Sequence, residues 1–251
     1  KMKRALIFSL LIVFGISVFA QVHGYLGSRF FIDANVSLAP DLKRQALDNS
    51  YDKLFRIRTP FSADVNFVAG NGASLGAKAT LTNVTGTFYR ASYNDDYYFT
   101  GIANYKTKIF SLYLEGHSRS GYSVIDNYFR IGLCLATLKN FEYTYSRVES
   151  VYSSPVSNVF PDSMTSLALN QTAAMAGLYY EFGNRVPLSN HLLFYYGISG
   201  YVFPIRNVVH TYDDYPHISM RETDTYIRDL GKRRVANTNM LNLNFGLTWA
   251  F

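Results

Sequence analysis

Acidic side chains and histidines gather in two short segments of this 251-residue sequence, so hydrolysis is the first chemistry to consider. One segment contains the adjacent Asp95 and Asp96. The other contains His210, Asp213, Asp214 and His217. A carboxylate beside an imidazole can act as a general base that activates water. Neighbouring residues of an extended chain point in opposite directions, so Asp95 and Asp96 are poorly spaced to aim at one site. We interpret both segments as solvated loops and keep hydrolysis as the alternative.

A second hydrolytic arrangement would combine His117 and Ser118 with Glu115, because a serine hydroxyl needs an adjacent base to become a nucleophile. On a strand, the side chains of His117 and Ser118 would point to opposite faces. His210 and His217 lie seven residues apart with no cysteine or third histidine nearby, which is a poor metal site. The sequence therefore predicts no catalytic residue, no metal site and no cofactor.

Charged residues of both signs also occur inside segments that otherwise alternate between apolar and small polar residues. Those expected to face one enclosed space are Asp33, Asp64, Lys78, Glu115, Arg130 and Glu142. Buried charges are tolerated when they are paired and hydrogen-bonded, so we expect a structural network of ion pairs. A narrow path for solutes through this space is the alternative.

A period of two predicts the elements that position these residues. Near the end of the chain every second residue is apolar, as in Leu241, Leu243, Phe245, Leu247, Trp249 and Phe251. This period places alternate side chains on opposite faces of a strand, here from Asn239 to Phe251. The same pattern predicts nine further strands at about 30–38, 61–67, 75–82, 97–106, 109–118, 127–138, 141–150, 167–182 and 191–203. Eight strands in total are the alternative, because 75–82 and 97–106 alternate least clearly.

The predicted connections fall into two alternating classes. Short ones lie near 70–73, 107–108, 139–140 and 183–190. Long ones lie near 39–59, 83–96, 118–126, 151–166 and 204–236, and we find no sustained helical periodicity in them. Short turns at one end and long loops at the other are typical of membrane-spanning barrels. With an even strand count, both termini lie on the side of the short turns.

The polar faces of these strands favour a lipid environment for the apolar faces. They contain mainly Asn, Ser, Thr, Gly and Ala, whereas the outer face of a sheet in water would be rich in Lys and Glu. In hydrocarbon every backbone N–H and C=O needs a partner, which strands achieve only by closing into a barrel. The sequence thus predicts an all-β fold, a closed antiparallel up-and-down transmembrane β-barrel. Aromatic residues expected at its membrane interfaces are Tyr105, Tyr180, Phe182 and Trp249.

Residues 1–20 have the layout of a signal peptide, with Lys1, Lys3 and Arg4 before an apolar run that ends at Ala20. An uncleaved N-terminal anchor is the alternative. Three of the 24 basic residues lie in this segment, which leaves 21 basic against 18 acidic residues in 21–251, the single predicted domain. This small excess gives little support to nucleic-acid binding. Cys134 is the only cysteine, so an intrachain disulfide is excluded.

The final residues, Leu243 to Phe251, resemble the terminal strand of small outer-membrane β-barrel proteins of Gram-negative bacteria, which ends in an aromatic residue. The resemblance identifies no subfamily. It implies export through the periplasm into the outer membrane, where the barrel-assembly machinery would recognise Phe245, Trp249 and Phe251. Outer-membrane lipid would then surround the barrel, and an envelope or extracellular protein partner stays unidentified.

Three basic residues close the longest predicted loop, namely Lys232, Arg233 and Arg234. Lysine and arginine pair well with phosphates, so contacts with lipopolysaccharide are one interpretation and an ordinary solvated run is the other. The function predicted from the sequence is a non-enzymatic outer-membrane barrel with a structural or surface-interaction role, with a narrow pore as a further option. The alternative is a hydrolase active at the barrel rim, as in ten-stranded outer-membrane proteases.

Overall fold

The structure is a computed structural model that describes residues 28–42, 55–70, 73–91, 97–117, 125–150, 163–166, 172–204 and 220–251. The predicted signal peptide at 1–20 lies outside these residues. So do Asp95, Asp96, Ser118 and the histidines and aspartates of 210–217. The structure therefore tests the barrel and its interior, and leaves those predictions as they stand.

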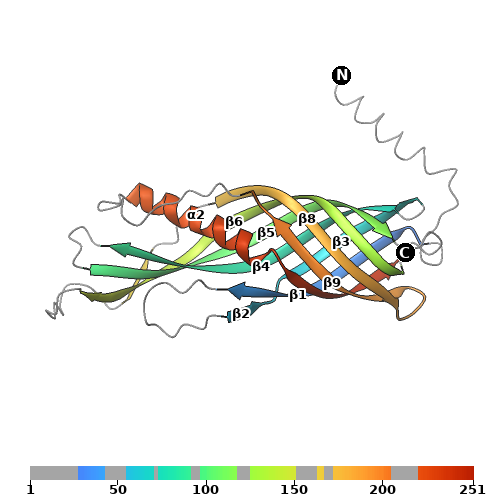
Figure 1. Cartoon of the computed structure of the whole chain (residues 1–251), viewed down its shortest axis with the longest axis horizontal. Helices are drawn as coiled ribbons and strands as arrows, with labels where there is room; N and C mark the ends of the chain where they lie inside the picture. The colour runs from blue at the N-terminus through green and yellow to red at the C-terminus, as the bar shows by residue number, and fades with distance from the viewer. Residues whose placement is uncertain are drawn as a thin grey trace, which may run out of the picture.

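Eight antiparallel strands form a closed barrel in the described residues (Figure 1). They are β1 (Phe30–Leu42), β3 (Phe61–Gly70), β4 (Ala73–Ala91), β5 (Tyr97–His117), β6 (Asp126–Ser150), β8 (Thr172–Pro187), β9 (Leu192–Val202) and β10 (Asn242–Ala250). Each pairs with the next of these strands, and β10 pairs with β1 from Phe31↔Ala250 to Leu38↔Leu243. Two short strands, β2 (Phe55–Arg58) and β7 (Ser163–Ser166), pair antiparallel with the loop-end parts of β1 and β6. The predicted fold class is confirmed.

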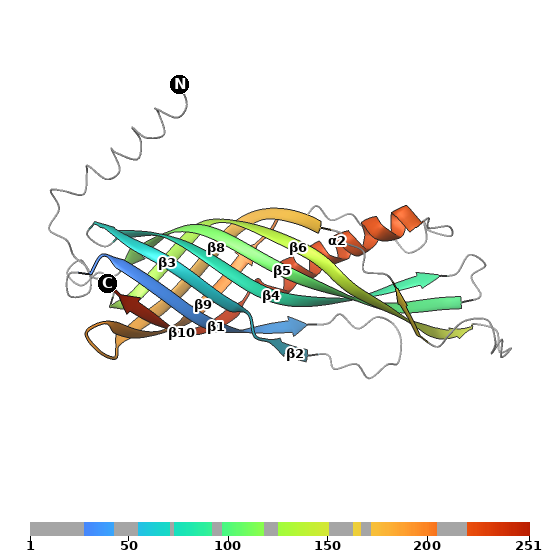
Figure 2. The ribbon, with the colours of Figure 1, turned by 180° about the vertical axis from the view of Figure 1, so that it is seen from behind.

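The two ends of the barrel differ, and we name them the turn end and the loop end. The connections β3–β4, β5–β6 and β8–β9 lie at the turn end together with the C-terminus (Figures 1 and 2). At the opposite, loop end, β4, β5 and β6 run far beyond the other strands (Figure 2). β5 has 21 residues and β6 has 25, whereas β10 has 9.

The ten predicted strands become eight because two predicted turns do not exist. Positions 107–108 lie inside β5, and positions 139–140 lie inside β6. Within β5 the apolar residues change face: Phe110 points outward, whereas Ile109 and Tyr105 point into the barrel. That change was interpreted as the boundary between two strands. Tyr105 was also predicted at the membrane interface, but it is 2% exposed and lies inside the barrel.

A helix, α2 (Met220–Thr238), occupies part of the connection 204–236, where no helix was predicted. It contacts β1, β4, β5, β6 and β8, which lie around the barrel, so α2 sits in the mouth of the lumen at the loop end (Figure 1). Gly231 allows this close approach, because a Cβ there would lie 2.6 Å from Cε1 of Tyr105.

The last carbonyl groups of α2, which have no backbone partner within the helix, accept hydrogen bonds from side chains. The Thr238 hydroxyl donates to the carbonyl of Arg234 at 2.6 Å, and the Asn239 amide donates to the carbonyl of Val235 at 2.7 Å. The guanidinium of Arg58 donates to the carbonyl of Thr238. A cation at this position also favours the negative end of the helix dipole.

The outer surface of the barrel is apolar. Large outward side chains include Leu75, Phe110, Leu112, Leu114, Ile131, Leu133, Leu135, Leu178, Phe182 and Trp249. Exposed apolar patches larger than a few hundred Å² are rare on monomeric proteins in water, so this surface fits a lipid environment. No helix among the described residues is both long and apolar enough to cross a membrane.

The contact between α2 and β5 leads to a stability prediction for Gly231→Ala. Alanine favours a helix by up to about 1 kcal/mol over glycine, but overpacking a filled interior costs roughly 1–3 kcal/mol. We expect Gly231→Ala to lower the midpoint of urea unfolding in detergent. Gly116→Ala is the matched control, because a Cβ there meets no atom within 4 Å. A higher midpoint for Gly231→Ala would show that α2 does not pack against Tyr105.

Candidate functional site

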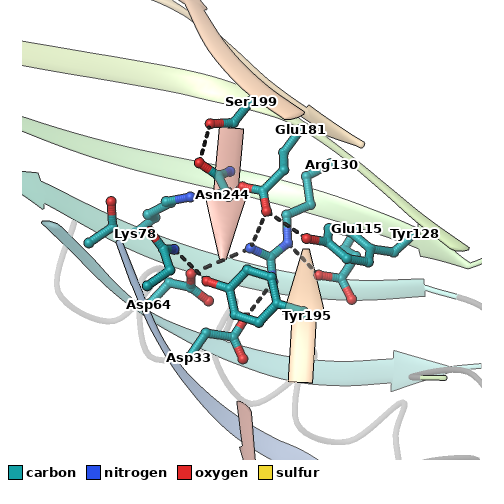
Figure 3. Close-up of polar contacts among 12 residues, drawn as sticks. Asp33, Asp64, Lys78, Glu115, Tyr128, Arg130, Glu181, Tyr195, Ser199 and Asn244 are labelled. Atoms are coloured by element: carbon teal, nitrogen blue, oxygen red, sulfur yellow. Dashed lines mark hydrogen bonds and ion pairs between the residues drawn. The ribbon is translucent and has the colours of Figure 1, made fainter. Parts of the chain in front are cut away.

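Arg130, on β6, is the centre of a charged cluster in the turn-end half of the lumen (Figure 3). Its guanidinium contacts Glu115 on β5 at 2.5 Å and Asp33 on β1 at 2.6 Å. It also contacts Asp64 on β3 at 3.4 Å and Glu181 on β8 at 3.6 Å. One fully buried side chain therefore connects carboxylates from four strands across the interior.

A second guanidinium, that of Arg185 on β8, shares two of these carboxylates. Its two terminal nitrogens donate to Glu115 at 2.6 and 2.9 Å, and one also reaches Asp33 at 3.4 Å. The ring of Tyr128 lies 4.9 Å from the guanidinium carbon of Arg130 and 4.4 Å from that of Arg185. These cation–π contacts further stabilise the two buried charges.

Tyrosines and a lysine bind further carboxylate oxygens of the cluster. Lys78 on β4 contacts Glu181 at 2.8 Å and donates to the hydroxyl of Tyr179 at 3.2 Å. Tyr128 donates to Glu181 at 2.7 Å, and Tyr113 donates to Asp64 at 3.0 Å. The described cluster thus combines four carboxylates with three cations, which allows these charges to be buried together. We name it the lumen network.

The loop-end half of the lumen contains an apolar layer. Its buried side chains are Val84, Ile109, Tyr113, Cys134, Ala136, Leu138, Tyr179, Tyr201, Phe203, Val235 and Ala236, of which the last two belong to α2. Asp41 of β1 fixes the helix above this layer, because it forms ion pairs with Arg234 of α2 and, at 3.9 Å, with Arg58 of β2. Asp41 is 1% exposed, so these contacts are shielded from water.

Five of the six residues predicted to line the lumen lie together in the network: Asp33, Asp64, Lys78, Glu115 and Arg130. The side chain of the sixth, Glu142, lies outside the described residues, and its backbone pairs with Asn104. The prediction missed Glu181 and Arg185. Glu181 lies opposite the apolar face of its predicted strand and could have been found from the alternation. Arg185 was missed because that strand was predicted to end at 182.

His117 contacts two groups that resemble parts of a hydrolase site. Its Nε2 lies 3.1 Å from Glu115 Oε1 and 3.1 Å from Ser74 Oγ. A catalytic triad uses both ring nitrogens, one for the serine and one for the acid. Here both partners meet the same nitrogen, and Glu115 is already bound by two arginines. This arrangement cannot work as a triad, and the described residues form no cluster of three or more metal ligands.

The basic residues predicted to contact lipopolysaccharide are on α2. Lys232 lies 3.4 Å from Asp229, and Arg234 points to the barrel, where it donates to the carbonyl of Thr85 at 3.0 Å and pairs with Asp41. Arg234 therefore fastens the helix to the barrel. Contact of Lys232 and Arg233 with lipopolysaccharide stays a prediction.

The C-terminal aromatic residues predicted as an assembly signal face outward. Phe245 is 46%, Trp249 41% and Phe251 65% exposed. The Phe251 amide donates to the carbonyl of Phe30 at 2.9 Å, and their ring centroids are 6.5 Å apart. These side chains therefore lie at the seam where β10 meets β1. Their recognition by assembly machinery stays a prediction.

The fold and the lumen together define a closed eight-stranded β-barrel with a filled interior. Its sequence matches no known family and no curated protein.

Similar solved structures include the outer membrane protein OprG from Pseudomonas aeruginosa, with 12% identity, a TM-score of 0.47, and coverage of 92% of this chain and 99% of that one. The N-terminal β-barrel domain of Pseudomonas aeruginosa OprF shows 7% identity, a TM-score of 0.42, and coverage of 89% and 98%. Ail of Yersinia pestis shows 9% identity, a TM-score of 0.38, and coverage of 89% and 97%. These distant similarities assign no activity.

The central position of Arg130 predicts a large effect of Arg130→Met. Removing one partner of a buried ion-pair cluster costs roughly 3–5 kcal/mol, because the other charges remain buried. We expect a large drop in the urea midpoint, or loss of the folded form on unheated gels. Arg228→Met is the control, because Arg228 is exposed on α2. An unchanged midpoint for Arg130→Met would refute the network as a stabilising element.

The contacts of Asp41 predict a local effect of Asp41→Asn. The substitution removes the charge that binds both Arg234 and Arg58, so α2 should open more often while the barrel stays closed. We expect faster hydrogen exchange of the amides of 228–238 and unchanged exchange in β10. Asp229→Asn is the matched control, because Asp229 pairs with Lys232 on the same helix. Equal hydrogen exchange of the amides of 228–238 in the two variants would show that Asp41 does not hold α2 against the barrel.

Proposed function

We propose that this protein is a non-enzymatic barrel of a Gram-negative outer membrane with a filled lumen. Its long strands at the loop end would form a surface for interaction outside the cell. The observation that carries the proposal is the filling of the interior at two levels. The lumen network closes the turn-end half, and α2 with its apolar layer closes the loop-end half.

The membrane location is supported by the outer surface and by the closure of the sheet. The outward side chains are apolar, and the β10–β1 pairing gives the backbone of β1 and β10 hydrogen-bond partners, as hydrocarbon requires. The aromatic end of β10 and the predicted signal peptide favour an outer membrane reached through the periplasm. In this proposal the assembly machinery recognises Phe245, Trp249 and Phe251.

The lumen argues against a pore. Interiors of eight-stranded barrels are just wide enough for side chains to fill, and here Arg130 bridges carboxylates from four strands. A solute would have to separate several buried ion pairs and then displace α2. A structural or surface-interaction role is therefore better supported than the narrow pore considered from the sequence.

The long strands support a surface role. A tilted strand needs about 9–11 residues to cross a membrane, whereas β5 has 21 and β6 has 25. At about 3.3 Å per residue, ten extra residues add roughly 33 Å of strand length, or roughly 23 Å of height at a tilt of about 45°. With the turn end in the periplasm, this projection would stand outside the cell, where a protein partner of the envelope or the environment could reach it.

Planar-bilayer recordings test the filled lumen. We expect refolded wild-type protein to insert and to give no resolvable single-channel current, with an open 16-stranded porin as the positive control under the same conditions. Insertion is checked separately by heat-modifiable mobility of the protein recovered from vesicles. Steady unitary currents from inserted protein would contradict the proposal, and so would wild-type protein that remains in the aqueous fraction without detergent.

A further inference from the structure

The lumen network contains one more acidic than basic side chain. The seven charged members are Asp33, Asp64, Glu115, Glu181, Lys78, Arg130 and Arg185, and each of them is at most 3% exposed. With every group ionised, the network would therefore have a net charge of −1 in an interior shielded from water. An enclosed charge without compensation is costly. One further positive charge is needed, and its source is a proton on a carboxyl group, a proton on His117 or a bound cation.

Asp64 has the weakest contact with a cation among the four carboxylates of the network. Its Oδ2 atom lies 3.4 Å from the guanidinium of Arg130, and its Oδ1 atom accepts a hydrogen bond from the neutral hydroxyl of Tyr113 at 3.0 Å. Each of the other three carboxylates has a guanidinium or ammonium nitrogen at 2.5–2.8 Å. The missing positive charge is therefore needed most at Asp64.

Asp33 lies directly opposite Asp64 in the β1–β3 ladder, and both side chains point inward. Their carboxyl groups are within hydrogen-bond reach of each other, and Arg130 contacts both (Figure 3). The Oδ1 atom of Asp33 has no hydrogen-bond partner in the part of the chain that the structure describes. Two ionised carboxylates at this separation repel each other, whereas one retained proton removes the repulsion and supplies a donor.

We propose that the Asp33–Asp64 pair is a proton-binding site, in which Asp64 keeps a proton at neutral pH and donates it in a hydrogen bond to Asp33. The bound proton makes the lumen network electrically neutral. Its release leaves two adjacent carboxylates inside the barrel, so alkaline conditions destabilise the contact between β1 and β3. This inference goes beyond the proposed function, because it assigns to the filled lumen a bound ligand that is the proton itself.

The groups around the pair leave the missing charge at Asp64. The titratable and charged residues that face it are Lys78 on β4, Tyr113 and Glu115 on β5, Tyr128 and Arg130 on β6, Tyr179, Glu181 and Arg185 on β8, and Tyr195 on β9. The three cations in this set already contact other carboxylates at short range. His117 meets Glu115, which two guanidinium groups already bind, so a proton on His117 would not compensate Asp64.

Infrared spectroscopy of the wild-type protein in detergent tests the bound proton without any variant. A neutral carboxyl group has a C=O stretching band that carboxylates lack, and this band moves in D2O. We expect the band at neutral pH in wild-type protein, its loss in Asp64→Asn and its retention in Asp229→Asn. Asp229 is a suitable control because it pairs with Lys232 on α2. A wild-type spectrum without the band would overturn the inference, as would a band that persists in Asp64→Asn.

Urea unfolding at several pH values measures the proton through its linkage to stability. In the unfolded chain an aspartic acid loses its proton at about pH 4, so unfolding near neutral pH releases the proton that the folded barrel holds. Between about pH 6 and 8, each unit of pH should therefore raise the unfolding constant of wild-type protein roughly tenfold relative to that of Asp64→Asn. Asp33→Asn should lower the urea midpoint strongly, because Asp33 contacts two guanidinium groups. Parallel pH dependence of wild-type protein and Asp64→Asn would overturn the inference.

Two further measurements distinguish the other sources of positive charge. His117→Gln should keep the infrared band and the pH dependence of unfolding, whereas loss of that dependence would assign the proton to His117. Exchanging choline chloride for sodium chloride at equal ionic strength should leave the urea midpoint unchanged, whereas a higher midpoint in sodium would assign the charge to a bound cation. Either of these contrary results would overturn the inference. All of these measurements are made in detergent, so they are independent of the proposed membrane location.

Discussion

The buried guanidinium of Arg130 is the interaction on which the interior of this barrel depends. A closed sheet of eight strands encloses a narrow space that side chains can fill, and charged side chains enclosed there need partners. Arg130 meets this constraint by joining β1, β3, β5 and β8 through one group. Arg185 binds Glu115, and Lys78 binds Glu181. The register of the sheet and the pairing of these charges therefore stabilise each other, since a slip of one residue in any of these strands would turn a charge towards lipid.

The lumen contains a charged network in its turn-end half and an apolar layer in its loop-end half. The apolar layer includes residues of α2. In the turn-end half, opposite charges fill the space between strands. In the loop-end half, the chain enters the barrel itself, and Val235 and Ala236 pack against inward residues such as Ile109 and Val84. Val235 and Ala236 of α2 are apolar, so the strand residues that contact them are apolar as well, whereas Arg234 of the same helix pairs with Asp41. One barrel thus contains two kinds of interior, and neither has the character of an aqueous channel.

The regular parts of the fold could be predicted from the sequence, and the exceptions have one physical origin. Alternation located β10, β3 and most of the lumen network, because a period of two places Asp33, Asp64 and Arg130 on the inner face. The alternation failed in β5, where Tyr105 and Ile109 are apolar but face inward because they contact α2 and its apolar layer. A single sequence gives no sign that a distant helix will enter the lumen, so the reversal was interpreted as a turn. The bulge between Asn104 and Tyr105 interrupted the pattern further.

The distribution of charge connects the interior with the membrane surface. Folding places acidic and basic side chains of the barrel strands inside, in matched contacts, and leaves an outer surface that lipid can cover. Lys106, Lys108 and Lys139 point outward and depart from this arrangement, but they lie where the apolar rows of β5 and β6 end. A charge in or beside a low-dielectric medium needs a partner, so the ion pairs around Arg130 and the apolar outer rows of the strands follow from the same physical constraint.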